Sequence, residues 1–362
     1  MPSTSAAIWD KEIPVPVRTI SYVDDGIVKR LPEGTRIMSI SPSGSSYWAR
    51  TAKIEALDAR GRPVNYFVKV HQGEKGKLMV SSEFEAMILL FRVIPEMVAR
   101  PVACGSYESE DDTHFFVCEF CELSDDIPDP HPFASLVAEL HKRGVSPNGM
   151  FGMPYVTFGG NAPQLFPVTE SWEECFTTGI RGVFAAELKS QGADEDIEML
   201  TSTILEKVIP RLLRPLAEDG RTITPRLVHG DLWDGNASVD VKTGKPMIFD
   251  ATPLYAHSEL SRIDDLAPWK IQRHRMTQKY IDEYIEHFPI SEPKEEFEDR
   301  LWLYCLSKEN MRRLIDLYGE GYDIYRARKN PEGNILRNKQ ASTANNATLA
   351  AAVDEPVSAS LG

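Results

Sequence analysis

The chain has 362 residues, of which 40 are Lys or Arg and 54 are Asp or Glu, giving a net charge of −14. This length suggests two structural lobes, each with enough residues for its own core. The charge argues against nucleic acid and against an anionic membrane as default partners, although solubility alone would also explain it. The first residues lack a basic segment followed by an apolar one, and no apolar run approaches the length of a bilayer span. We therefore expect a cytoplasmic protein.

Five cysteines are too few and too scattered for a small disulfide framework. Cys118 and Cys121 form a CxxC pair, but neither a second pair nor a histidine cluster accompanies them. Apolar neighbours favour buried thiols over a zinc or redox site.

Three strands are predicted near the N-terminus, at Ile37–Ile40, Tyr47–Leu57 and Asn65–His71. A loop of small residues with Ser43 and Gly44 joins the first two strands. This order is typical of a loop that covers a nucleotide, where backbone N–H groups approach phosphate oxygens. The loop has only one glycine, so an ordinary hairpin is the alternative.

Lys69 lies in the third strand between apolar residues. Buried lysines are rare unless paired, and in kinases such a lysine pairs with the nucleotide phosphates and a helix glutamate. The next predicted helix is Met79–Val93, and Glu83 is the acid that leaves an apolar face intact. The alternatives are a snorkelling lysine on an edge strand and a glutamate that complements the helix dipole.

Phe115–Phe120 reads as an apolar strand, and the segment after it, Ser124–Pro132, is rich in Asp and Pro. This change marks a hinge between an N-lobe (1–122) and a C-lobe (123–325). In a kinase, backbone groups near Glu119 and Cys121 would recognise adenine. Residues 326–362 lose apolar periodicity, and we expect a disordered tail.

The C-lobe is predicted to be mainly helical. His141 ends the first of its helices and is interpreted as a helix-terminal residue, not a catalyst. The glycine-rich stretch Ser146–Leu165 fits either a substrate-side loop or a packed crossover. Further helices are expected at four places: Ser171–Ser190, Glu195–Glu218, Met276–Phe288 and Lys294–Arg313.

The most informative segment is Leu227–Asp250, LVHGDLWDGNASVDVKTGKPMIFD. Asp231 precedes Asn236 by the Asp-to-Asn spacing of a kinase catalytic loop, and an apolar hairpin then leads to Asp250. Asp231 would orient the acceptor hydroxyl and take its proton, while Asn236 and Asp250 offer the hard oxygen ligands that Mg²⁺ prefers. An isolated HGD would fit a surface hairpin equally well, but the complete run favours the kinase interpretation.

Three motifs together, VHGDLWDGN, IFDATPLYAHSE and the upstream FVKV…SEFEAM, resemble the fructosamine kinases, also called ketosamine-3-kinases. These are relatives of the aminoglycoside and choline kinases. The resemblance runs from about residue 15 to about residue 305, and the N-terminal half looks most like the fungal branch, to which protein-ribulosamine 3-kinases are assigned. It implies an α+β, bilobal protein-kinase-like fold, with an antiparallel sheet plus a helix in the N-lobe and a mainly helical C-lobe.

The resemblance also implies ATP and Mg²⁺, and phosphorylation of the sugar 3-hydroxyl of a ketosamine (ribulosamine or fructosamine) on a lysine. The phosphorylated adduct is unstable, so the activity would repair glycated amines or glycated protein lysines. By match, Asp231 would be the base, Asn236 and Asp250 the metal ligands, Lys69 the phosphate-binding lysine and Glu83 its partner.

Trp233 would lie near the sugar. His257 and Glu259, beside the proposed site, would orient the substrate or the metal ligands, with packing as an equal alternative. The single glycine of the phosphate loop and the run LSRIDD after Glu259 depart from the family pattern. Two alternatives therefore stay open: a kinase of the same fold for another hydroxylated amine or pathway metabolite, and a non-catalytic kinase-like binding module.

Overall fold

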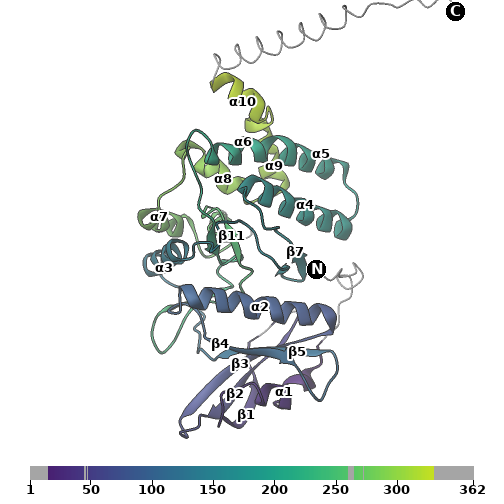
Figure 1. Ribbon diagram of the computed structural model, residues 1–362, viewed down its shortest axis with the longest axis vertical. Helices are drawn as coiled ribbons and strands as arrows, with labels where there is room; N and C mark the ends of the chain where they lie inside the picture. Colours follow the sequence, from purple (N-terminus) through teal and green to yellow (C-terminus); the bar gives the residue numbers. More distant parts are fainter. Residues whose placement is uncertain (1–14, 45, 47, 260–264, 272, 330–362) are drawn as a thin grey trace, which may run out of the picture.

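The computed structural model describes residues 15–329, apart from positions 45, 47, 260–264 and 272. Its N-terminal part is a five-stranded antiparallel sheet of order β1-β2-β3-β5-β4, with α2 across one face and α1 on the other (Figure 1). The elements of this part are η2 (Val17–Ile20), α1 (Asp25–Val28), β1 (Arg36–Pro42), β2 (Arg50–Leu57), β3 (Pro63–Gln72), α2 (Gly73–Val93), β4 (Pro101–Ser106) and β5 (Thr113–Glu119).

Successive side chains of the central strands point to opposite faces of the sheet, and this determines which of them face α2. On β5, Phe115 and Val117 belong to the core that includes α1, whereas Phe116 and Cys118 belong to the core that includes α2. Lys69 of β3 stands opposite Phe116 in the antiparallel register. Because directly opposed residues lie on the same face of a sheet, Lys69 points toward α2.

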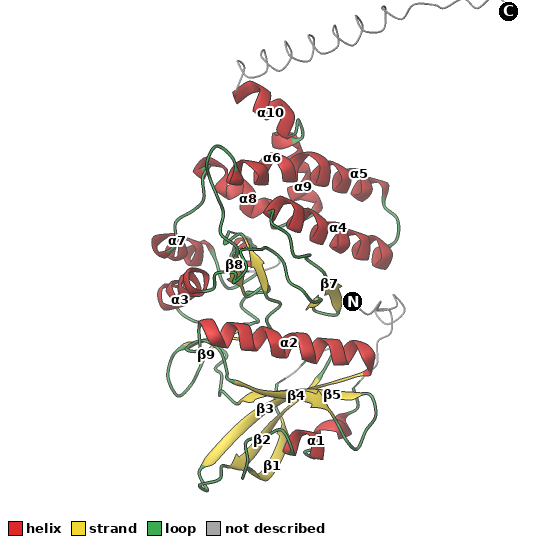
Figure 2. Cartoon of the chain, in the orientation of Figure 1, coloured by secondary structure: helices red, strands yellow, loops and turns green. Residues whose placement is uncertain are grey.

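The C-terminal part is mainly helical (Figure 2), and it also contains three short two-stranded ladders. Its helices are α3 (Pro130–Arg143), α4 (Trp172–Gln191), α5 (Glu195–Thr203), η3 (Ile204–Val208), α6 (Ile209–Leu213), η4 (Arg214–Ala217), η5 (Ala267–Lys270), α7 (Gln278–His287), η6 (Lys294–Glu296), α8 (Phe297–Leu303), α9 (Lys308–Tyr318) and α10 (Tyr322–Lys329). The ladders pair β6 (Thr157–Gly159) with β7 (Ala162–Gln164), β8 (Arg226–Val228) with β11 (Leu254–Ala256), and β9 (Ala237–Val239) with β10 (Pro246–Ile248).

The β9–β10 hairpin is bonded to both segments that lead to and from the sheet. Its three backbone bonds are Ile248 N to Met97 O (2.8 Å), Val241 N to Glu122 O (2.8 Å) and Ser124 N to Val239 O (2.9 Å). The hairpin therefore joins the two parts of the molecule.

Helix α2 begins at Gly73, earlier than the predicted start at Met79. The segment before Met79 contains two glycines, which disfavour a helix on propensity alone. Gly76 is needed there because a Cβ at this position would lie 2.7 Å from Cβ of His71 on β3. Packing of α2 on the sheet thus overrides the local preference.

Two predictions at the C-terminal end are wrong. Instead of one helix over Lys294–Arg313, α8 ends at Leu303 and α9 begins at Lys308, where the Ser307 hydroxyl accepts a bond from the Asn310 amide. The predicted disordered tail from 326 is wrong for residues 326–329, which belong to α10; residues 330–362 lie outside the described part of the chain. Among the described helices none is long and apolar enough to cross a membrane.

Candidate active site

Lys69 and Glu83 meet between β3 and α2, as the sequence predicted. The Lys69 ammonium lies 2.9 Å from a Glu83 carboxylate oxygen, and both side chains are only 12% exposed. The same ammonium donates to Oδ1 of Asp250 at 2.8 Å, although Asp250 is far away in sequence. One lysine therefore connects the sheet, the helix over it and the β9–β10 hairpin.

The charges of this group are unbalanced. Burial opposes ionisation of Lys69, but the charges of Asp250 and Glu83 outweigh it and raise the pKa of the lysine. Burial raises the pKa of Glu83 to about 7, against the attraction of Lys69. Burial also opposes the ionisation of Asp250, but its ion pair with Lys69 prevails and lowers the pKa of that carboxyl. When Glu83 is ionised, two carboxylates share one ammonium, and a cation would neutralise the negative charge that results.

Asp231 lies on a tight loop after β8. Gly230 has φ +92°, and a Cβ there would lie 1.8 Å from the Thr252 carbonyl oxygen, so only glycine fits. His229 orients the loop, because its Nε2 bonds the Phe249 carbonyl at 3.0 Å and its Nδ1 accepts from the Asp231 amide at 3.3 Å. The loop thus fixes the backbone on both sides of Asp231.

The Asp231 carboxylate combines a bond from Asn236 with a raised pKa. Asn236 Nδ2 donates to Oδ2 of Asp231 at 2.8 Å and also to its carbonyl oxygen at 2.8 Å. Burial raises the pKa of Asp231 to about 7, and the charge of Asp250 adds to this effect while the Asn236 bond opposes it. A general base works best when its pKa lies near the operating pH.

Asn236 and Asp250 form a donor set that fits Mg²⁺. The bonds of Asn236 to Asp231 use its amide nitrogen, so its amide oxygen remains an acceptor. Asp250 adopts φ +57°, an uncommon conformation for a non-glycine residue, at the end of the hairpin. Hard oxygens beside excess negative charge are the surroundings that Mg²⁺ requires.

The sequence-predicted residues line one cavity of about 380 Å³. Lys69, Glu83, Asp231, Asn236 and Asp250 all contribute to it. Further walls come from residues that sequence reasoning did not single out, namely Ser46, Trp48, His71, Phe158 and Gly160. Phe158 and Gly160 belong to the β6–β7 hairpin, so the glycine-rich stretch reaches the site and is not only a crossover.

Ser43 and Gly44 lie in the loop between β1 and β2, where the Ser43 amide donates to the Thr51 carbonyl at 3.1 Å and Gly44 has φ +79°. The loop reaches the cavity through Ser46 and Trp48, and contact of Ser43 and Gly44 with a nucleotide stays a prediction. Adenine recognition near Glu119 and Cys121 also stays a prediction. The Glu119 amide donates to the Arg100 carbonyl at 2.8 Å.

His71 follows Lys69 by two residues and shares its face of β3. Its side chain is 3% exposed, and its Nε2 has no hydrogen-bond partner among the described residues. Burial, assisted by the charge of Lys69, lowers the pKa of His71 to about 3. The cavity wall therefore contains a neutral imidazole with an unused polar atom, a feature that no local sequence pattern signals.

A second cavity of about 370 Å³ also reaches Asp231 and is lined by Trp233, Arg273 and His274. The Trp233 ring is 36% exposed and lies 5.3 Å from the His274 ring, which is held by Asp234 at 2.9 Å. A third cavity, of about 210 Å³, also reaches Asp231 and has apolar walls from α4. Trp233 thus lies on an accessible wall beside Asp231, and its contact with a sugar stays a prediction.

His257 and Glu259 do not face these cavities, and the prediction that they contact substrate is wrong. Both are buried, at 1% and 2% exposure. Glu259 accepts from Arg300 Nε at 2.7 Å and from the Ser291 amide. His257 bonds the Ser291 hydroxyl at 2.8 Å, and burial lowers the pKa of its imidazole to about 4. The packing alternative is the correct one, because the chain after Asp250 turns inward at β11.

Asp265 holds the backbone of the loop that carries Asp231. Its carboxylate, fully buried, accepts from the amides of His229 (2.9 Å) and Gly230 (3.1 Å). His141 of α3 bonds the same carboxylate through Nε2 at 2.8 Å and the Tyr284 hydroxyl through Nδ1 at 2.7 Å. His141 is therefore a buried positioning residue, not only the end of a helix. This contact has no local signal in the sequence, because α3 and Asp265 are distant along the chain.

The two-part fold and this interlobe cluster define the kinase-like class of proteins. Residues 51–328 match the family model described as fructosamine kinase, and the chain belongs to that family. A solved structure of a "putative fructosamine-3-kinase" from Thermobifida fusca aligns with a TM-score of 0.58 at 19% identity, covering 83% of this chain and 97% of that one. At this identity the alignment shows the shared fold.

Two curated relatives are similar in sequence. The protein-ribulosamine 3-kinase of Oryza sativa subsp. japonica is 30% identical over 63% of this chain, and the match spans 63% of the rice protein. The ketosamine-3-kinase of Mus musculus is 36% identical over 30% of this chain and 33% of its own length.

Proposed function

We propose that this protein transfers the γ-phosphoryl group of ATP to the 3-hydroxyl of a ketosamine, a ribulosamine or fructosamine on an amine such as a lysine side chain. The observation that carries the proposal is the convergence of Lys69, Asp231, Asn236 and Asp250 on one cavity, from segments far apart in the sequence. The family to which the chain belongs, and the names of its relatives, support the ketosamine as acceptor.

Each residue has a chemical task in this reaction. Lys69, held by Glu83, would bind phosphate oxygens of the nucleotide. Asp231 would accept a hydrogen bond from the acceptor hydroxyl and take its proton as the oxygen attacks phosphorus. Asn236 and Asp250 would hold Mg²⁺, which when bound supplies neutralisation of the phosphate charge. Phosphoryl transfer depends mostly on positioning and charge, so these fixed groups supply what the reaction needs.

The acceptor side fits a glycated amine. Trp233 offers an indole face at the mouth of the cavity beside Asp231, and the apolar C–H face of a sugar would pack on it. The product would carry phosphate at C3, next to the C2 carbonyl. Enolisation between C1 and C2 would expel phosphate, a better leaving group than hydroxide, from C3. Water would then hydrolyse the resulting C1 imine, which releases the free amine and leaves a 3-deoxy dicarbonyl sugar.

The test compares acceptors. The protein is incubated with Mg-ATP and either ribulosyl-lysine, fructosyl-lysine, choline or an aminoglycoside, and release of ADP is followed. We expect turnover with the ketosamines, with free lysine and inorganic phosphate appearing afterwards. Turnover with choline or the aminoglycoside alone would favour the kinase for another hydroxylated amine. Nucleotide binding without turnover of any acceptor would favour the non-catalytic module.

Asp231→Asn identifies the site responsible for the turnover. It should lose turnover without a fall in its melting temperature, and Asp111→Asn, an exposed acid in the turn between β4 and β5, should behave like the wild type. Equal activity in Asp231→Asn would refute the role of Asp231.

A further inference from the structure

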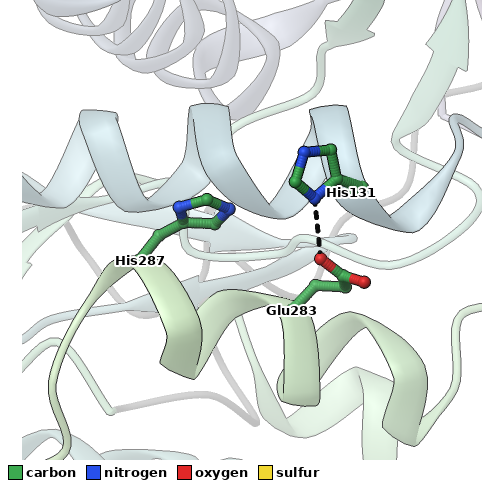
Figure 3. A group of neighbouring side chains, drawn as sticks. All are labelled: His131, Glu283 and His287. Carbon is green, nitrogen blue, oxygen red and sulfur yellow. Dashed lines mark hydrogen bonds and ion pairs between the residues drawn. The ribbon is translucent and has the colours of Figure 1, made fainter.

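Three potential metal ligands meet on the C-terminal part, away from the cavity described above. His131 is at the start of α3, and Glu283 and His287 are on α7 (Figure 3). Their ligand atoms all lie within 4.8 Å of one another. His131 Nδ1 is 2.8 Å from Oε2 of Glu283, and the two imidazole rings are 5.5 Å apart.

The spacing suits a metal ion. Glu283 and His287 are four residues apart on a helix, so their side chains project from the same face. His131 completes the group from the neighbouring helix, and Figure 3 shows all three side chains in the space between α3 and α7. Two imidazole nitrogens and one carboxylate oxygen suit Zn²⁺ and similar transition ions, whereas Mg²⁺ and Ca²⁺ prefer oxygen ligands alone.

A surface ion pair between His131 and Glu283 would account for only part of this arrangement. His287 Nε2 is buried and has no hydrogen-bond partner within the described residues. A buried polar atom without a partner is costly, and ligation of a metal by His287 would remove that cost. We propose that His131, Glu283 and His287 form a Zn²⁺-binding site that joins α3 to α7.

The site would act on the helix pair that supports the catalytic loop. Tyr284, next to Glu283 on α7, bonds His141 of α3, and His141 bonds Asp265 below the loop. A metal ion bound by His131 of α3 and by Glu283 and His287 of α7 would hold these two helices together. The site is independent of the proposed kinase activity, and its occupancy is measured without turnover.

The first experiment measures binding of Zn²⁺ to metal-free protein by calorimetry, in an Asp250→Asn background that weakens the predicted Mg²⁺ site. We expect one Zn²⁺ per chain. His131→Asn, Glu283→Gln and His287→Asn should each weaken binding by about tenfold or more, because a lost ligand costs at least as much as a lost outer-shell partner. Glu286→Gln, an exposed neighbour on α7, should bind like the parent.

The second experiment identifies the ligands. Co²⁺ in place of Zn²⁺ should give a spectrum without a thiolate charge-transfer band, since the five cysteines take no part. Zn²⁺ should raise the melting temperature of the parent and of Glu286→Gln, but not of His287→Asn. Undiminished binding in all three ligand variants, or a thiolate band with Co²⁺, would overturn the proposal.

Discussion

Nε2 of His141 lies 2.8 Å from Oδ2 of Asp265, and this buried contact joins α3 to the loop that carries Asp231. Asp265 also accepts the backbone amides of His229 and Gly230, so it fixes the loop without touching the cavity. The position of Asp231 therefore depends on buried residues that bond to the backbone of its loop.

Asp265→Asn should lower kcat by about tenfold to a hundredfold with a smaller change in KM, because a displaced base loses orientation more than substrate binding. Steady-state kinetics and thermal melting test this. Asp240→Asn is the matched control, since Asp240 is also buried but bonds Thr243 at the hairpin turn. It should lower the melting temperature with kcat largely retained. Equal losses of kcat in both variants would show that Asp265 acts through general stability.

The pH dependence of turnover should report Asp231. Its pKa is raised to about 7, mainly by burial, and only the ionised carboxylate accepts a proton. The value of kcat/KM should therefore rise with pH up to about 7 and then level off, with a tenfold fall per pH unit well below that point. A profile that stays flat from pH 5.5 to 8 would contradict the assignment of Asp231 as the base.

The contribution of Asp231 to folding stability should depend on pH in the opposite direction to turnover. Because burial raises the pKa of Asp231 above its unfolded value, the charged form is disfavoured in the folded state. The Asp231 carboxyl destabilises the fold most above pH 7, and this destabilisation disappears as the pH falls toward 4. Asp231→Asn should thus raise the melting temperature relative to wild type at pH 8, and much less at pH 4.5. Calorimetric scans at both pH values measure the difference, which no change in exposed charge would produce.

Lys69→Met should destabilise the protein by on the order of 1–3 kcal/mol at neutral pH, less than for a fully buried pair because the Asp250 side chain is 51% exposed. The variant leaves Glu83 and Asp250 facing each other without a counter-ion. Protonation of Glu83, whose pKa burial already raises to about 7 in the wild type, removes the repulsion, so the difference from wild type should shrink as the pH falls through about 7. Urea unfolding at several pH values tests this, with Lys53→Met of β2, a half-buried lysine paired with the exposed Glu55, as the control.

His71→Leu should lower nucleotide affinity without lowering stability. Removal of the unpartnered Nε2 leaves the free protein as stable as before or more so, while the affinity for Mg-ATP should fall about threefold to tenfold. The effect should be constant from pH 5 to 9, because burial lowers the pKa of His71 to about 3 and the ring stays neutral. His114→Leu is the control, since its Nδ1 already bonds the Ser106 hydroxyl at 2.8 Å. It should lower the melting temperature and spare nucleotide affinity.

The residues that sequence analysis located share a local signal. Asp231, Asn236 and Asp250 belong to one short segment, and Lys69 stands out as a cation in an apolar strand. His71, Trp48 and Asp265 have no such signal, because their roles depend on which distant segments the fold brings together. The error at His257 and Glu259 has the same origin. These residues are near Asp250 in sequence, but the chain after β11 places their side chains in the protein interior.

The hairpin that holds Asn236 and Asp250 also carries mechanical consequences. Its bonds to Met97, Glu122 and Ser124 mean that the sheet cannot rotate away from the helices unless the hairpin follows or those bonds break. In the proposed reaction, widening of the cleft to exchange the nucleotide would therefore displace Asn236 and Asp250. Release of the product and loosening of the cation would then be a single coordinated motion.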